Sequence, residues 1–102
     1  DTVLEEGMVV TNEPGVYVKD SHGIRIENML YVCKDEANEY GQFLRFETLT
    51  YTPIDIDLID VKYLDDACIA WLNNYHKECY EKLSPRLNEE EKAWLKQYTR
   101  AI

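Results

Sequence analysis

Two glutamates and an arginine near the start of the chain have the residue types and spacing to do chemistry. Arg25 and Glu27 lie two positions apart in an apolar, strand-like segment. Because side chains alternate along a strand, they would share one face with their Cα atoms about 6.5–7 Å apart. Glu13 directly precedes Pro14, which favours an extended conformation for it. Carboxylates held in this way are candidate metal ligands, although an exposed ion pair on an edge strand and an exposed turn residue would look the same.

The elements that must position these residues are strands. Apolar and β-branched runs, interrupted by turn residues, predict that the first fifty residues form a sheet. Pro followed by Gly at positions 14 and 15 predicts a type II turn. The strands are expected at residues 8–12, 16–18, 24–33 and 43–50, with a polar turn at 19–23.

The second half of the chain is expected to be helical. One predicted helix has Asp65 as its N-cap and ends at Ser84-Pro85. Its apolar face recurs at helical spacing, through Cys68, Trp71, Leu72, Tyr75 and Cys79.

A last short helix is predicted after Asn88, which with Glu91 resembles a capping box. Strands first and helices last indicate an α+β protein. We expect the large apolar side chains of both helices to form core or dimer contacts, namely Trp71, Leu72, Tyr75, Trp94 and Leu95.

The composition excludes several classes of partner. The net charge of −9 opposes binding to nucleic acid or to an anionic membrane. No apolar run is long enough to span a bilayer, and no signal peptide is visible. Three cysteines without a CxxC spacing indicate reduced thiols in a cytoplasmic protein. The chain opens at Asp1 without an initiator Met, which suggests that sequence upstream has been removed.

Two short motifs resemble a known family. TNEPG at 11–15 and GIRIEN at 23–28 are similar to the two C-terminal metal-ligand motifs of the pita-bread metallopeptidases, which include aminopeptidase P, prolidase and methionine aminopeptidase. The preceding LEEGMVV at 4–10 fits as well. ETLT at 47–50 and WLNNYH at 71–76 resemble the C-terminal extension of the eukaryotic-type cytosolic aminopeptidase P.

The resemblance implies a fold, an activity and roles for the site residues. Residues 1–52 would form the C-terminal β part of a pita-bread catalytic domain, and residues 53–102 a helical extension. Glu13 would ligate one metal ion, Glu27 would bridge two, and Arg25 would orient Glu27. The ions would be Mn²⁺, with Zn²⁺ or Co²⁺ as alternatives. The full-length enzyme, a cytoplasmic homodimer, would release the N-terminal residue from Xaa-Pro peptides.

The same resemblance implies that the site is incomplete in this chain. The family's two ligand aspartates, its ligand histidine and its further histidines lie upstream of the first glutamate motif, so the chain alone is expected to be inactive. His22 stands where the family commonly has an aromatic residue, and His76 is expected to pack or cap a helix. Two alternatives are a non-catalytic pita-bread relative that binds a protein partner and an autonomous acidic interaction domain.

Overall fold

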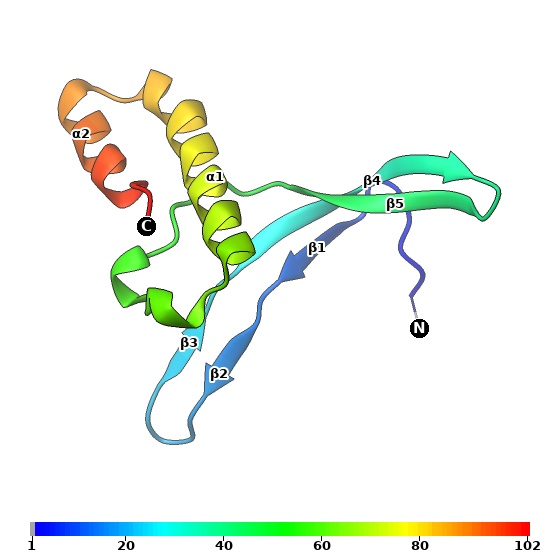
Figure 1. The fold of residues 1–102 in the computed structure, drawn as a ribbon, viewed down its shortest axis with the longest axis horizontal. Helices are drawn as coiled ribbons and strands as arrows, with labels where there is room; N and C mark the ends of the chain where they lie inside the picture. The colour runs from blue at the N-terminus through cyan, green and yellow to red at the C-terminus, as the bar shows by residue number, and fades with distance from the viewer. Residues whose placement is uncertain (1) are drawn as a thin grey trace. The chain divides into compact units, whose positions relative to one another are not determined.

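A computed structural model describes residues 2–102, and Asp1 lies outside the described residues. The chain divides into two compact units, one ending at Thr50 and the other running from Tyr51 to Ile102. Figure 1 shows strands in the first and helices in the second. The predicted α+β class is therefore confirmed.

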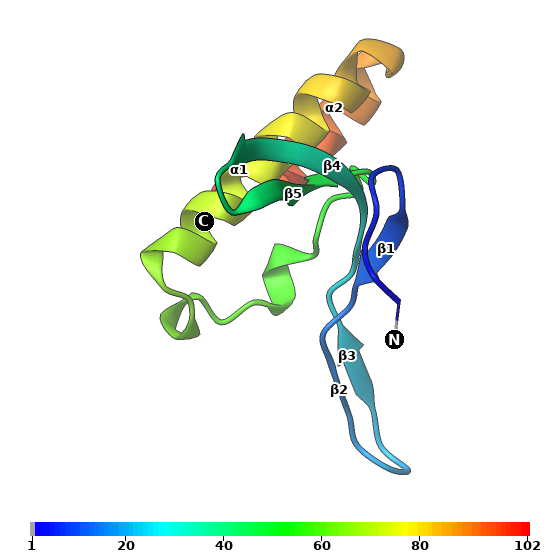
Figure 2. The same ribbon diagram turned by 90° about the vertical axis from the view of Figure 1, so that its right-hand side faces the viewer.

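The first unit is built from antiparallel strands. Its three-stranded sheet has the order β1-β4-β5, formed by β1 (Val9–Asn12), β4 (Asn28–Asn38) and β5 (Gly41–Thr48). A second pair, β2 (Gly15–Tyr17) and β3 (Gly23–Arg25), forms a hairpin. Figure 2 shows this hairpin continuing the line of the β1 and β4 pair.

The predicted turn at Pro14-Gly15 is wrong. The chain passes through these residues from β1 into β2 without reversing, and Gly15 does not have the positive φ that a type II turn requires at that position. The chain reverses in the predicted polar turn after β2 instead. There Asp20 has a φ of 56°, and the Val18 N–H donates to the His22 carbonyl at 2.8 Å.

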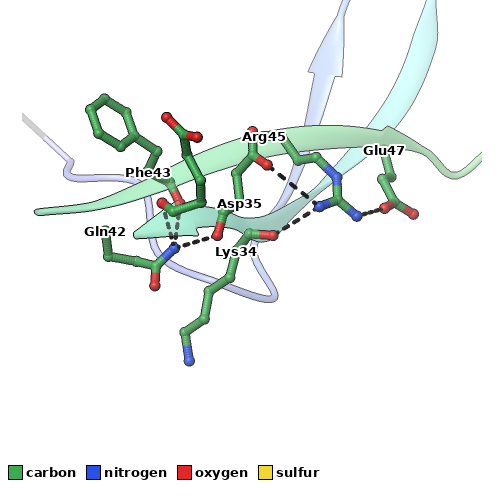
Figure 3. A network of polar contacts seen from close by, with 7 residues as sticks. Lys34, Asp35, Gln42, Phe43, Arg45 and Glu47 are labelled. Atoms are coloured by element: carbon green, nitrogen blue, oxygen red, sulfur yellow. Dashed lines mark hydrogen bonds and ion pairs between the residues drawn. The ribbon is translucent and has the colours of Figure 1, made fainter. Parts of the chain in front are cut away.

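The long strand predicted at residues 24–33 is also wrong in extent. It is interrupted before Asn28, and the next strand runs on through polar residues to Asn38. No alternating apolar pattern marks residues 34–42, where backbone pairing and polar side chains support a hairpin. The Gln42 side chain donates to the carbonyls of Asp35 and Glu36, which lie where the β4 and β5 register shifts. Figure 3 shows Gln42 and Arg45 reaching across to backbone oxygens of β4.

The second unit contains two helices, α1 (Asp66–Leu83) and α2 (Glu89–Tyr98). Both predicted caps are confirmed: Asp65 accepts from the Cys68 N–H at 2.7 Å, and Asn88 and Glu91 form the reciprocal capping box. Three short 3₁₀ helices complete the unit, at Ile56–Leu58, Val61–Tyr63 and Ser84–Arg86.

The buried face of α1 is rotated from the predicted one. Cys68 is exposed and Trp71 is 51% exposed, whereas His76 is fully buried. Trp94 on α2 is likewise 58% exposed, so neither tryptophan is buried within this unit, and the dimer contact expected as the alternative stays a prediction. The buried residues of the unit are Ile56, Leu72, Tyr75, His76, Cys79 and Leu95. The three cysteines are free, as predicted.

His76 packs α1 against the segment that precedes it, which confirms its predicted structural role. Its Nε2 accepts from the Ile54 N–H at 3.0 Å, so the neutral ring carries its proton on Nδ1. Burial lowers the pKa of His76, and the backbone groups of Arg100 and Ile54 oppose that shift in part.

This burial predicts a pH dependence. Unfolded His76 titrates near pH 6.5, whereas the folded residue stays neutral to lower pH, so the unfolded state binds more protons below about pH 6.5. The free energy of unfolding should then fall as the pH drops from 7 to 5, by at most about 1.4 kcal/mol per pH unit. Denaturant unfolding at several pH values measures this slope. His76→Gln should flatten it and exposed His22→Gln should not; equal slopes for wild type and His76→Gln would exclude His76 as the cause.

Candidate metal centre

Backbone pairing places Glu13 opposite Glu27. Asn12 pairs with Asn28 in the β1 and β4 ladder, and Gly15 pairs with Arg25 in the hairpin. The register is continuous between these two pairs, because two residues lie between them on each strand. The Ile26 N–H donates to the Pro14 carbonyl at 3.3 Å, as this register requires.

This register gives the two glutamates the closer of the two antiparallel geometries. Pro14 and Ile26 form a hydrogen-bonded pair, so the neighbouring pair of Glu13 and Glu27 is non-hydrogen-bonded. In such pairs the Cα atoms lie roughly 4.5 Å apart and both side chains leave the same face. Like charges placed directly opposite destabilise a sheet. A bound cation would remove this repulsion, and carboxylate oxygens are suitable ligands for Mn²⁺.

Arg25 lies on the same face and contacts Glu27. Its Nε is 3.0 Å from Glu27 Oε2, which confirms the prediction that the two side chains share one face. Their side chains are 50% and 33% exposed. A hydrogen bond with Tyr17, followed by the charge of Glu27, raises the pKa of Arg25. The guanidinium is therefore held between a phenol and a carboxylate and stays charged.

Tyr17 is a member of this face that the sequence reasoning missed. Its ring lies over Gly15 and Gly23: a Cβ at Gly15 would be 2.8 Å from the Tyr17 hydroxyl, and one at Gly23 would be 2.8 Å from the ring. Both glycines are thus needed to leave room for the tyrosine. Its place could have been predicted from the sequence, because residues 13, 15 and 17 of an extended segment point to the same side and Tyr17 therefore shares the face of Glu13.

The opposite face of the hairpin is apolar. Val16, Val18, Ile24 and Ile26 are 65%, 46%, 62% and 45% exposed, respectively. The expectation that Ile24 and Ile26 point away from Arg25 and Glu27 agrees with the register, since their positions alternate with the charged ones. The hairpin therefore separates a face bearing polar groups from a face bearing only aliphatic ones.

A second polar cluster follows on the sheet. Tyr31, paired with Glu47 across β4 and β5, donates to its Oε2 at 2.6 Å, and Arg45 binds the other oxygen. The hydrogen bond from Tyr31 and then that from Arg45 lower the pKa of Glu47, while Glu47 raises the pKa of Tyr31 to about 12. Figure 3 shows Arg45 reaching Glu47, Asp35 and the Lys34 backbone. Both carboxylate oxygens of Glu47 are therefore bonded to side chains of the same sheet.

No complete metal site lies within the described residues. Residues 2–102 contain no group of three or more His, Cys, Asp or Glu side chains placed to hold an ion.

His22 is in the β2–β3 loop, with its Nδ1 2.8 Å from the Ser21 hydroxyl. No helix among the described residues is long and apolar enough to cross a membrane.

The packing of Tyr17 predicts the effect of Gly23→Ala. The added methyl group meets the Tyr17 ring, so the substitution should lower the free energy of unfolding by about 1–3 kcal/mol. In a Tyr17→Thr background the same change should be neutral or stabilising by about 0.4–1 kcal/mol. Denaturant unfolding of the four proteins in this cycle provides the comparison. An equal cost in both backgrounds would mean that Tyr17 does not fill this space.

The chain is similar to known proteins over nearly its whole length. Residues 1–34 match the metallopeptidase family M24, and residues 42–102 match the C-terminal region of peptidase_M24. The chain is 45% identical to Aminopeptidase P2 of Arabidopsis thaliana over 99% of its length, and 41% identical to a probable Xaa-Pro aminopeptidase P of Coprinopsis cinerea over 100%. It spans only 15% and 17% of the length of these two relatives.

A solved structure shows the same fold. The crystal structure of X-prolyl aminopeptidase from Caenorhabditis elegans, described as a cytosolic enzyme with a di-nuclear active site, matches with a TM-score of 0.80 and 34% identity. The match covers 97% of this chain and 17% of that one. The expected fold, the C-terminal portion of a pita-bread metallopeptidase, is confirmed. With both of its units matched, the chain belongs to metallopeptidase family M24.

Proposed function

We propose that this chain is the C-terminal part of a dinuclear-metal aminopeptidase that releases the N-terminal residue from Xaa-Pro peptides, and that it supplies two of the metal ligands. The observation that carries the proposal is the opposed pair of carboxylates, Glu13 and Glu27, on one face of the strands. The names of the relatives and the di-nuclear site of the C. elegans enzyme support it.

Each residue has a proposed role. Glu13 would ligate one ion and Glu27 would bridge both, since a carboxylate can offer one oxygen to each of two ions. Arg25 holds Glu27 in orientation and balances its charge through the contact at 3.0 Å. We expect the ions to be Mn²⁺, with Zn²⁺ or Co²⁺ as alternatives. When bound, they would lower the pKa of a water molecule enough for it to act as a nucleophile toward a peptide carbonyl near neutral pH.

The remaining ligands would come from the rest of a longer polypeptide. Within residues 2–102, Glu13 and Glu27 have no third His, Cys, Asp or Glu placed with them to hold an ion. Two aspartates and a histidine from an upstream segment would complete the set, and the isolated chain would be inactive. In this proposal residues 1–52 belong to the catalytic domain and residues 53–102 form a helical extension.

The wider setting of the full-length enzyme is part of this proposal. We place the full-length enzyme in the cytoplasm, as the C. elegans enzyme is described, and expect it to be a homodimer that acts on proline-containing peptides. A non-catalytic pita-bread relative that binds a protein partner is the alternative. The upstream sequence separates the two, because only the enzyme needs the aspartates and the histidine.

Metal content separates the roles of the two glutamates in the full-length protein. Glu13→Gln should retain about one ion per site, whereas Glu27→Gln should weaken binding of both, because an amide offers only one good acceptor oxygen. Both variants should lose turnover. Arg25→Ala should keep more metal than either and lose about 10- to 100-fold in activity. Metal analysis after dialysis, alongside turnover, decides the matter. A Glu27→Gln protein that holds two ions and works normally would assign the bridge to another residue.

A further inference from the structure

We propose that Thr11 is a positioning residue for Glu13 and holds this carboxylate in the orientation in which it binds its metal ion; the inference rests on the proposed function. The Thr11 hydroxyl donates to Glu13 Oε1 at 2.6 Å. This distance is typical of a hydroxyl bonded to a charged carboxylate, which is a stronger interaction than a neutral hydrogen bond. The hydroxyl binds Oε1 alone, and Arg25 on the same face also interacts with Glu13 through its charge.

The strand fixes the position of the donor. Thr11 lies in β1, where its backbone pairs with Met29 of β4. It precedes Glu13 by two residues in an extended segment, so the two side chains leave the same face. Branching at Cβ restricts the χ1 rotation of threonine and narrows the positions that its hydroxyl can take. The exposed Glu13 carboxylate is thereby tied to the β1 and β4 ladder through the Thr11 hydroxyl.

Glu27 is held in the same manner, by the residue two positions before it, but with a different electrostatic consequence. Arg25 Nε contacts Glu27 Oε2 at 3.0 Å and brings a positive charge. Thr11 contacts Glu13 without adding charge. Removing the Thr11 hydroxyl therefore alters the orientation of Glu13 and leaves the charge of the site unchanged. The defect should be confined to the ion that Glu13 ligates.

The test measures Mn²⁺ binding by calorimetry, with Mn²⁺ alone, on the full-length protein. Thr11→Val keeps the shape and strand preference of the residue and removes the hydroxyl. It should weaken the affinity for one ion by about 10- to 100-fold, the usual effect of removing a partner of a metal ligand, and leave the other ion unchanged. Thr11→Ser, which keeps the hydroxyl, should restore most of the affinity. Thr48→Val, in β5 of the same sheet, is the matched control and should bind both ions as the wild type does.

Several results would overturn the positioning role. One is a Thr11→Val protein that binds both ions normally, and another is one that loses both equally. A Thr11→Ser protein no better than Thr11→Val would also contradict it, because the hydroxyl would then not be the group that matters. Glu13→Gln separates this failure from failure of the proposed function. If Glu13→Gln loses one ion and Thr11→Val loses none, only the positioning role is wrong. If Glu13→Gln itself binds both ions normally, Glu13 is not a ligand and both proposals fail.

Discussion

Backbone hydrogen bonding holds Glu13 opposite Glu27. It joins the segment from β1 to β2 with the segment from β3 to β4. The register set by β1 and β4 continues unbroken into the β2 and β3 hairpin, although Pro14 removes one donor from the ladder. The pairing forces two like charges together, which a sheet alone would disfavour. Thr11 and Arg25 each take one oxygen of one carboxylate and so reduce the freedom of both groups.

The other features of the first unit follow from this pairing. Alternation sends Tyr17 to the side of the glutamates, where it packs over two glycines and reaches Arg25. The same alternation leaves Val16 and Ile24 on the other side, exposed in this chain. The helical unit carries none of the proposed ligands. It has a core of its own, in which the Tyr75 ring stacks on Tyr51 and Trp71 and its hydroxyl donates to the Thr52 carbonyl at 2.6 Å.

Local signals in the sequence were sufficient for some elements and not for others. The caps of both helices were predictable, because Asp65 and Asn88 act on N–H groups within the same turn. The shared face of Arg25 and Glu27 followed from their spacing alone. The opposition of Glu13 and Glu27 did not, because register is a property of two strands. Pro14-Gly15 has the composition of a turn, yet here Gly15 makes room for a tyrosine ring, which only tertiary structure reveals.

The pairing of Glu13 with Glu27 can be measured directly by NMR on the isotopically labelled chain. Non-hydrogen-bonded antiparallel partners bring their Hα atoms close together. We expect a strong Hα–Hα nuclear Overhauser effect between Glu13 and Glu27, in series with those between Thr11 and Met29 and between Gly15 and Arg25. A register shifted by one residue, with Glu13 Hα close to Ile26 or Asn28 instead, would send the two carboxylates to opposite faces. That result would contradict the account of the site.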